Sequence, residues 1–443
     1  MRIQLSEHFN YKKLLLFVAP SVIMMVFTNI YTVVDGLFVS NFAGAEAVAA
    51  INRIFPLILI LGSIGFMLGT GGSALVSKTL GEGDNKRANE YFSLLVYVTL
   101  LLGVVIAAAG QFAVPLAARL LGAKGKTFDY CVLYGRWLLA GQPFFILQNI
   151  FQSFFVTAEK PRLGLIVTVA AGVTNMVLDA VFIAGFKWGL TGAAAATVAS
   201  QVIGGVFPVI YFLRKNDSLL RLTKTKFYFK AILKSFTNGS SEFLSNVSAS
   251  VVTILYNEQV DKFAGDAGVA AYGIIMYVVL IFFAVFMGYS VGSAPLIGYN
   301  YGANNREELK NLFKRSMLLI TLFGVSMTAL SEACAYPLCR MFVSYDEELF
   351  QMTLRGFRIY CIAFLFTGYG VFGSAMFTAL NNGLISAAIS FLRTLLFQIV
   401  SVMVFPIFWG LDGVWSSIIF ADIASLITSF AFIFSFRKKY GYM

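Results

Sequence analysis

Long apolar runs alternate with short polar segments along all 443 residues of the chain. About 20 consecutive apolar residues suffice for a helix to cross a membrane, and the chain supplies such a run many times. We predict twelve membrane-spanning helices, over residues 14–40, 50–76, 92–114, 130–157, 163–186, 190–213, 236–260, 268–299, 314–338, 352–379, 384–408 and 413–436. The predicted fold class is therefore an all-α polytopic membrane protein.

Composition excludes the other classes. Apolar residues make up 58% of the chain and charged residues 12%, and the mean hydropathy is +0.79. A soluble protein could not bury so much apolar surface, because large cores split into domains instead of growing. The loops between the predicted helices are too short to hold a catalytic domain. We therefore expect neither an enzyme nor a cofactor.

The residue types that bind structural metals are sparse. The four cysteines are Cys131, Cys334, Cys339 and Cys361, none of them in a C-x-x-C pair, and the single histidine is His8. A zinc site needs several Cys, His or acidic side chains that converge. We expect no structural metal site and interpret the cysteines as small apolar residues.

Lys and Arg are unevenly divided between the two sides of the predicted bundle. The net charge is +11, and of 33 Lys and Arg, 22 lie on the side of both termini and 7 in the opposite loops. The positive-inside rule then places both termini in the cytoplasm, which an even number of crossings allows. In a membrane protein such charge sets topology and contacts lipid head groups. We expect a multi-pass protein of the cell membrane with no nucleic-acid partner.

The chain repeats itself with one offset. FAGAEAVAA (42–50) matches FAGDAGVAA (263–271) at six of nine positions, an offset of 221 residues, and the same offset relates GLTG (189–192) to GLDG (410–413) and Gly71 to Gly292. We predict an N-lobe of six helices (1–213), a basic cytoplasmic linker (214–234) and a C-lobe of six helices (235–443). Six crossings return the chain to its starting side. The lobes are therefore related by a pseudo-two-fold axis along the membrane normal, a pattern typical of transporters.

Four polar side chains stand out inside predicted helices of the N-lobe. Asp35, Asp179 and Thr197 lie at similar depth, each a few turns from the outer helix end, and Asn175 shares a helix face with Asp179. Oxygen ligands suit hard cations, and neighbouring carboxylates favour proton uptake. The cluster could thus bind a coupling proton or sodium ion. The alternative is a structural hydrogen-bond network with protonated acids.

The repeat distinguishes between these interpretations. The equivalents of Asp35, Asn175, Asp179 and Thr197 in the second half are Tyr256, Leu396, Val400 and Ile418. A polar network that the fold itself required would be kept in part in both halves. The cluster belongs to one lobe, which favours a functional role.

Other polar residues suggest a cavity and a second charged group. In the C-lobe, Arg393 could pair with Glu242 or Asp422, either as a structural ion pair or as part of the transport path. We predict that an internal cavity is lined by polar and aromatic residues of the N-lobe, namely Tyr31, Tyr134, Gln142, Phe144, Phe145, Gln148, Asn149, Gln152 and Gln201.

Several motifs resemble one transporter family. They are VVDGLFVS (33–40), AGAEAVAA (43–50), NMVLD (175–179) and GLTGAAAATVAS (189–200) in the first half, and VAAYGI (269–274), GYNYGA (298–303) and LRTLLFQIVSVMVFP (392–406) in the second. In their order and in the equal halves, they are similar to the multidrug and toxic compound extrusion (MATE) family across essentially the whole chain.

The resemblance implies two six-helix lobes that form a V and export amphipathic, often cationic compounds in exchange for protons or sodium ions. In the branch that this chain resembles, the N-lobe cation site consists of an Asp, an Asn and Asp pair, and a Thr, which match Asp35, Asn175, Asp179 and Thr197. A second branch uses a Glu and an Asp in the C-lobe. The predicted helix over 352–379 contains no acid, which argues against that site here.

The leading hypothesis is therefore a monomeric, cation-coupled antiporter for small amphipathic or cationic molecules. A lipid-linked oligosaccharide flippase of the same broad superfamily is the first alternative, although it would need a cationic cavity. A membrane receptor or scaffold without transport activity is the second, and it would not explain acids confined to one lobe.

Overall fold

The computed structural model describes residues 3–42, 44–343 and 346–443, and Ala43 of the first repeat motif lies outside them. The N-lobe consists of α1 (Tyr11–Phe42), α2 (Ala45–Gly81), α3 (Asn85–Leu120), α4 (Gly125–Ala140), α5 (Gln142–Thr157), α6 (Pro161–Asp179), the π-helical turn η1 (Ala180–Gly185) and α7 (Gly189–Leu213). The C-lobe consists of α8 (Phe229–Gly302), α9 (Arg306–Phe342), α10 (Glu347–Cys361), α11 (Phe364–Ala379), α12 (Gly383–Phe391), the π-helical turn η2 (Leu392–Leu396) and α13 (Phe397–Tyr440).

These elements make twelve crossings within the described residues. Eight helical stretches are long and apolar enough to span a membrane, and α10 and α11, bent by 51°, supply a ninth. The stretches that contain α8 and α13 each turn back once, so each supplies two crossings. The last crossing is α4 with α5, interrupted only at Gly141 because Pro143 has no backbone N–H to donate. The predicted fold class is confirmed.

The two sharp turns inside long helical stretches lie at glycines. Gly265 has a φ of 59° in α8 and Gly410 a φ of 55° in α13, a backbone conformation that only glycine adopts without strain. The offset of 221 relates them to Gly44 and Gly189, which also have positive φ. The repeat thus preserves the positions where the chain must turn between crossings.

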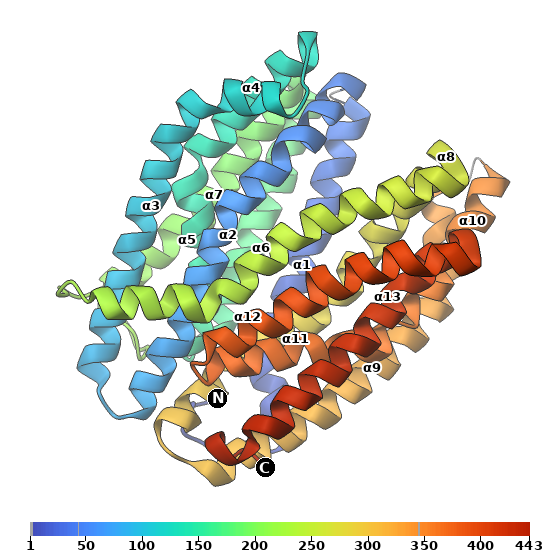
Figure 1. Ribbon diagram of the computed structural model, residues 1–443. Coiled ribbons are helices and arrows are strands. Elements are labelled where there is room, and N and C mark those ends of the chain that lie inside the picture. The colour runs from blue at the N-terminus through green and yellow to red at the C-terminus, as the bar shows by residue number, and fades with distance from the viewer. Residues whose placement is uncertain (1–2, 43, 344–345) are drawn as a thin grey trace.

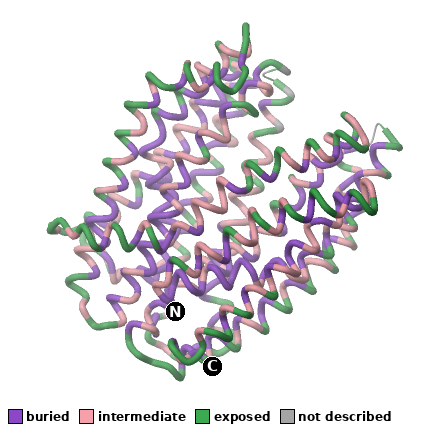
Figure 2. Tube along the Cα trace, viewed as in Figure 1, coloured by how far each residue is buried: buried purple, intermediate pink, exposed green. Residues whose placement is uncertain are grey.

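The two lobes meet at one end and separate at the other. In Figure 1, α1 to α7 form one bundle and α8 to α13 the second, and both chain termini lie at the end where the bundles are closest. Figure 2 shows buried residues inside each bundle and between the bundles near the termini, while exposed residues cover the outer faces. The arrangement is a V whose apex lies on the side of the termini.

Glycines allow helices from different lobes to touch near the apex. A Cβ on Gly239 of α8 would lie 1.8 Å from the backbone oxygen of Met67 in α2, and a Cβ on Gly71 would lie 2.0 Å from that of Ser235. The same Cβ on Gly71 would lie 2.5 Å from the backbone nitrogen of Gly239, and a Cβ on Gly292 would lie 2.8 Å from a side-chain carbon of Val18 in α1. Because the offset of 221 relates Gly71 to Gly292 and Val18 to Gly239, these last two contacts are symmetry mates.

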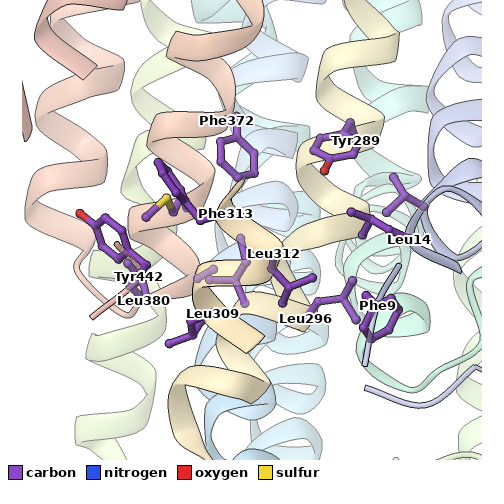
Figure 3. Close-up of a cluster of buried hydrophobic side chains, with 14 of the residues drawn as sticks. Phe9, Leu14, Tyr289, Leu296, Leu309, Leu312, Phe313, Phe372, Leu380 and Tyr442 are labelled. Atoms are coloured by element: carbon purple, nitrogen blue, oxygen red, sulfur yellow. The ribbon is translucent and has the colours of Figure 1, made fainter. Parts of the chain in front are cut away.

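Apolar packing and hydrogen bonds reinforce the apex. Phe9 and Leu14 join a buried cluster with C-lobe residues, of which Figure 3 labels Tyr289, Leu296, Leu309, Leu312, Phe313, Phe372, Leu380 and Tyr442. The backbone N–H of Leu5 donates to Glu159 of the N-lobe at 2.8 Å, and that of Phe9 donates to Glu308 of the C-lobe at 3.0 Å. The N-terminal segment therefore ties the two lobes together.

The connection between the lobes is fixed to the N-lobe. Along residues 214–228, the backbone N–H of Arg221 donates to Asn89 at 2.6 Å and that of Thr223 donates to Ser93 at 2.8 Å, both on α3. A hydrogen bond from Lys160 to Asp217 holds the pKa of that exposed carboxyl below its usual range. Helix α8 begins at Phe229, seven residues before the predicted helix, so the flexible part of the predicted linker is short.

We expect Gly239→Ala to lower the melting temperature of the purified protein clearly. The added methyl group cannot fit beside Met67, so the lobes must shift, and overpacking of this kind costs about 1–3 kcal/mol. Thermal unfolding in detergent, followed by tryptophan fluorescence, measures the change.

Gly273→Ala is the matched control, because nothing lies within 4 Å of a Cβ at this position in the same helix. Alanine favours a helix over glycine by about 1 kcal/mol, so this variant should melt at the same temperature or higher. Equal destabilisation by both variants would contradict the close approach of α2 and α8.

Candidate functional site

An inter-lobe cavity with a volume of about 450 Å³ lies on the open side of the apex. Helices α1, α2, α4, α5, α6 and α7 form its N-lobe wall and α8 its C-lobe wall. Seven of the predicted cavity residues line it: Tyr31, Tyr134, Phe145, Gln148, Asn149, Gln152 and Gln201. Its size lies in the range of sites that bind small organic molecules.

Close packing of α1 on α6 brings the two N-lobe acids together. A Cβ on Gly172 of α6 would lie 2.5 Å from the Phe27 ring and 2.8 Å from the Tyr31 ring, so only glycine lets α1 approach this closely. One to two turns farther from the apex, the carboxyl groups of Asp35 and Asp179 lie within hydrogen-bonding reach of each other. Asp35 lines the cavity, and Asp179 lies behind it, fully buried.

Three of the four carboxylate oxygens of the acid pair receive no hydrogen bond from the described residues. They are Oδ1 of Asp35 and both oxygens of Asp179. Two ionised carboxylates cannot hydrogen-bond to each other. Their contact therefore requires a proton on one of them, or a cation between them.

Asn175 and Thr197 complete the predicted cluster and also line the cavity. Asn175 is buried, and both polar atoms of its amide lack a partner. The Thr197 hydroxyl donates to the backbone oxygen of Ala193 at 2.9 Å, which leaves its lone pairs available. Tyr134 lies close enough to Asp35 and Asp179 to interact electrostatically with both. The structure thus brings all four predicted residues to one wall of the cavity.

The backbone changes form at Asp179. This residue ends α6, and the next six residues form the π-helical turn η1. Short π-helical turns within α-helices often occur at functional sites. Here the turn follows directly after the acid pair.

Two of the predicted cavity residues lie elsewhere. Gln142 is fully buried against α2, where its amide donates to the Ile58 backbone oxygen at 3.5 Å. Phe144 approaches α7 with its backbone, which would lie 2.7 Å from a Cβ on Gly205. Neither lines the cavity, because contacts with neighbouring helices hold both residues away from it.

The sequence analysis missed several residues of the cavity lining. Thr28, Asn29 and Thr32 line it from α1, and Asn246 lines it from α8. The signal was available in helical spacing, because Thr28 and Thr32 precede Asp35 by seven and three residues, and Asn246 follows Glu242 by four.

The C-lobe charges lie around a second cavity of about 280 Å³ next to the first. Glu242 and Arg393 both line it, and Glu242 also lines the larger cavity. Asp422 is buried and accepts a hydrogen bond from Thr367. The ion pair expected for Arg393 is not formed, because neither acid contacts its guanidinium directly in the described structure.

Among the described residues, no three His, Cys, Asp or Glu side chains converge as metal ligands would. The four cysteines are free thiols.

Comparison with known proteins identifies the class. The MatE family model matches residues 20–181 and again 242–404, which together make up most of the chain. The chain therefore belongs to the MatE family, whose members are membrane transporters and not enzymes. The resemblance inferred from the motifs is confirmed.

The similarity to relatives and to solved structures extends over nearly the whole chain. The chain is 27% identical to "Multidrug export protein MepA" of Staphylococcus saprophyticus over 428 residues, covering 94% of this chain and 92% of the relative. It is also 27% identical to the protein of the same name from Staphylococcus haemolyticus, covering 98% and 95%. A solved structure described as an outward-facing conformation of a multidrug resistance MATE family transporter superposes with a TM-score of 0.92 at 24% identity, covering 97% of this chain and 98% of that chain.

We expect cysteine substitution to report the cavity lining. In a Cys334→Ser background, which leaves only buried native thiols, Thr28→Cys should react with a small charged methanethiosulfonate in detergent. Gln142→Cys should not react, because Gln142 is fully buried. Mass spectrometry after timed labelling measures both, and equal labelling of the two sites would contradict the described cavity.

Proposed function

We propose that this chain is a secondary active antiporter that exports amphipathic, cationic drugs or toxic metabolites in exchange for protons or sodium ions. The observation that carries the proposal is the Asp35–Asp179 pair in the wall of an inter-lobe cavity, three of whose four carboxylate oxygens receive no hydrogen bond from the described residues. The names of the MepA relatives support the substrate class. No cofactor is needed.

Coupling follows from charge in this proposal. When the pair holds a proton or sodium ion, the wall of the cavity loses negative charge and attracts a cationic substrate less. When a cationic substrate binds, the ionised pair is favoured and the coupling ion is released. Antiport requires such antagonism between the two ligands.

We further propose that both termini lie in the cytoplasm and that the V opens to the outside of the cell membrane. The excess of basic residues on the side of the termini supports this orientation. The apex on that side would then be the closed inner gate, held by the packing of Phe9 and Leu14 and by the hydrogen bonds to Glu159 and Glu308.

The larger cavity favours cations over anionic lipid-linked sugars. Among the described residues that line it, Asp35 and Glu242 are acidic and none is Lys or Arg. A flippase for pyrophosphate-linked sugars would need the opposite charge. Membership of a transporter family leaves little support for a receptor or scaffold.

We expect Asp179→Asn to abolish export against a gradient, because an amide can neither release a proton nor ligate a cation as a carboxylate does. Asp35→Asn should be similarly severe, with export reduced by more than about tenfold. Thr197→Ala should be milder, since it removes a neutral oxygen. Ethidium movement in proteoliposomes, with proton and sodium gradients imposed separately, measures each variant and identifies the coupling ion.

Asp217→Asn is the matched control, because this acid is exposed outside the cavity, and it should export at the unmodified rate. Unmodified export by a well-folded Asp179→Asn protein would refute the N-lobe site. Absence of export by the unmodified protein under either gradient would refute the proposed function.

We expect lower pH to release a bound cationic dye. Protonation of Asp35 or Asp179 removes the negative charge that attracts the dye, so affinity should fall roughly tenfold between pH 8 and pH 5, within the usual range of coupling energies. Tyr31 and Tyr134 interact electrostatically with the pair, and Glu242 lines the same cavity from α8. Fluorescence titration in detergent measures the affinity. The pH dependence should weaken in Asp35→Asn, and a flat profile in the unmodified protein, insensitive also to sodium, would contradict competition.

A further inference from the structure

The smaller cavity has a chemical character of its own. Its volume is about 280 Å³, and ten of the side chains that line it are hydroxyls or amides, from both lobes. Two charged residues, Glu242 and Arg393, line it and interact electrostatically. Glu242 and Asn246 also line the larger cavity, so the two spaces are neighbours and one extended molecule can reach both.

Arg393 is not fully satisfied by the described residues. Its Nε atom is buried and makes no hydrogen bond with any of them. Glu242 faces it without contact, and Asp422 is held by Thr367. Arginine inside a membrane bundle is costly unless a carboxylate or carbonyl satisfies it, so this guanidinium is expected to bind an anion.

The nearby hydroxyls do not supply that partner. Ser374 shares a hydrogen bond with Ser390 at 2.8 Å, and the Thr394 hydroxyl donates to the Ser390 backbone oxygen at 2.7 Å. These groups satisfy one another and the backbone. The space beside the guanidinium therefore keeps room for a ligand, and Glu242 is the one acid among the described residues that line it.

The fold itself does not require Arg393. The offset of 221 relates it to Gly172, where the N-lobe packs Phe27 and Tyr31 instead of a charge. Arg393 lies within η2, and Asp179 lies directly before η1. Each lobe thus has a π-helical turn in the equivalent crossing, with an acid at the turn of the N-lobe and a base at the turn of the C-lobe.

We propose that the smaller cavity is a subsite for the carboxylate of a zwitterionic, amphipathic substrate, with Arg393 as its counter-ion. The planar guanidinium can donate two parallel hydrogen bonds to a carboxylate. The cationic part of the same molecule occupies the larger cavity on the side of Asp35. Glu242, where the cavities adjoin, repels a second negative charge and accepts hydrogen bonds from the middle of the substrate. This inference rests on the proposed export function and narrows its substrate class.

A matched pair of dyes tests the subsite. Rhodamine 110 carries a free carboxylate, and rhodamine 123 is its methyl ester with the same cationic ring system. Binding of both to purified protein in detergent is measured by fluorescence anisotropy. Arg393→Gln should weaken binding of rhodamine 110 by about tenfold, the usual effect of losing a charged hydrogen bond, and change binding of rhodamine 123 less than about twofold.

Two further variants separate the effect of the positive charge at Arg393 from the effect of its hydrogen-bond geometry and from a general effect of removing an arginine. Arg393→Lys keeps the charge but loses the two parallel hydrogen bonds, so rhodamine 110 should bind with intermediate affinity and rhodamine 123 as before. Arg355→Gln removes an exposed arginine paired with Asp412 outside the cavities and should affect neither dye. Melting temperatures confirm that each variant is folded.

The outcomes are distinct. Equal weakening of both dyes by Arg393→Gln, or no weakening of rhodamine 110, would overturn the subsite while leaving the export function intact. If the Arg393→Gln protein does not fold, unchanged rhodamine 110 affinity in Arg393→Lys overturns the subsite on its own. Failure of the unmodified protein to bind either dye would refute the proposed function and the subsite with it.

Discussion

The close approach of helices from opposite lobes at the apex is the constraint on which the rest of the structure depends. Near the pseudo-two-fold axis, a Cβ on Gly81 would lie 2.0 Å from the Tyr299 backbone oxygen, and a Cβ on Gly302 would lie 2.0 Å from that of Lys78. Small residues permit such contacts in membrane bundles, where apolar surface alone gives helices little reason to associate. The lobes are thus fixed at one end, and both cavities begin next to these contacts, at Thr70 of α2.

Both the fold and its turns could be predicted because the repeat keeps the positions that the backbone constrains most. Gly44 and Gly265, and likewise Gly189 and Gly410, occupy matched positions in the repeated sequence motifs, and all four have positive φ in the structure. Helix ends could not be predicted as well. The break predicted between residues 260 and 268 contains Gly265, but the helix continues up to this residue from both sides, and α8 begins inside what the sequence presents as a linker.

The candidate site, like the fold, could be predicted only in part from the sequence. Asp35 and Asp179 could be found because a carboxylate in an apolar run is costly and needs an explanation. The sequence does not show which neighbouring side chains face the cavity, because tertiary packing decides the direction in which each side chain points. Phe144 precedes Gln148 by one helical turn, yet the approach of its backbone to Gly205 separates it from the cavity. It was equally hard to predict that Asp422 does not pair with Arg393. Thr367 donates a hydrogen bond to Asp422 instead, and nothing in the sequence marks Thr367 as important.

Helix α1 is the physical link between the acid pair and the apex. Near its start, Val18 packs against Gly292 of the C-lobe, and farther along, Tyr31 packs against Gly172 of the N-lobe and Asp35 meets Asp179. Pro20, close to Val18, removes one backbone hydrogen bond of the helix, because proline has no N–H to donate. The helix therefore has one backbone hydrogen bond fewer next to the Val18–Gly292 contact. Under the proposed function, a change of charge at Asp35 would alter how firmly α1 is held to the N-lobe, and this weakened turn is where α1 would bend if the two lobes part at the apex.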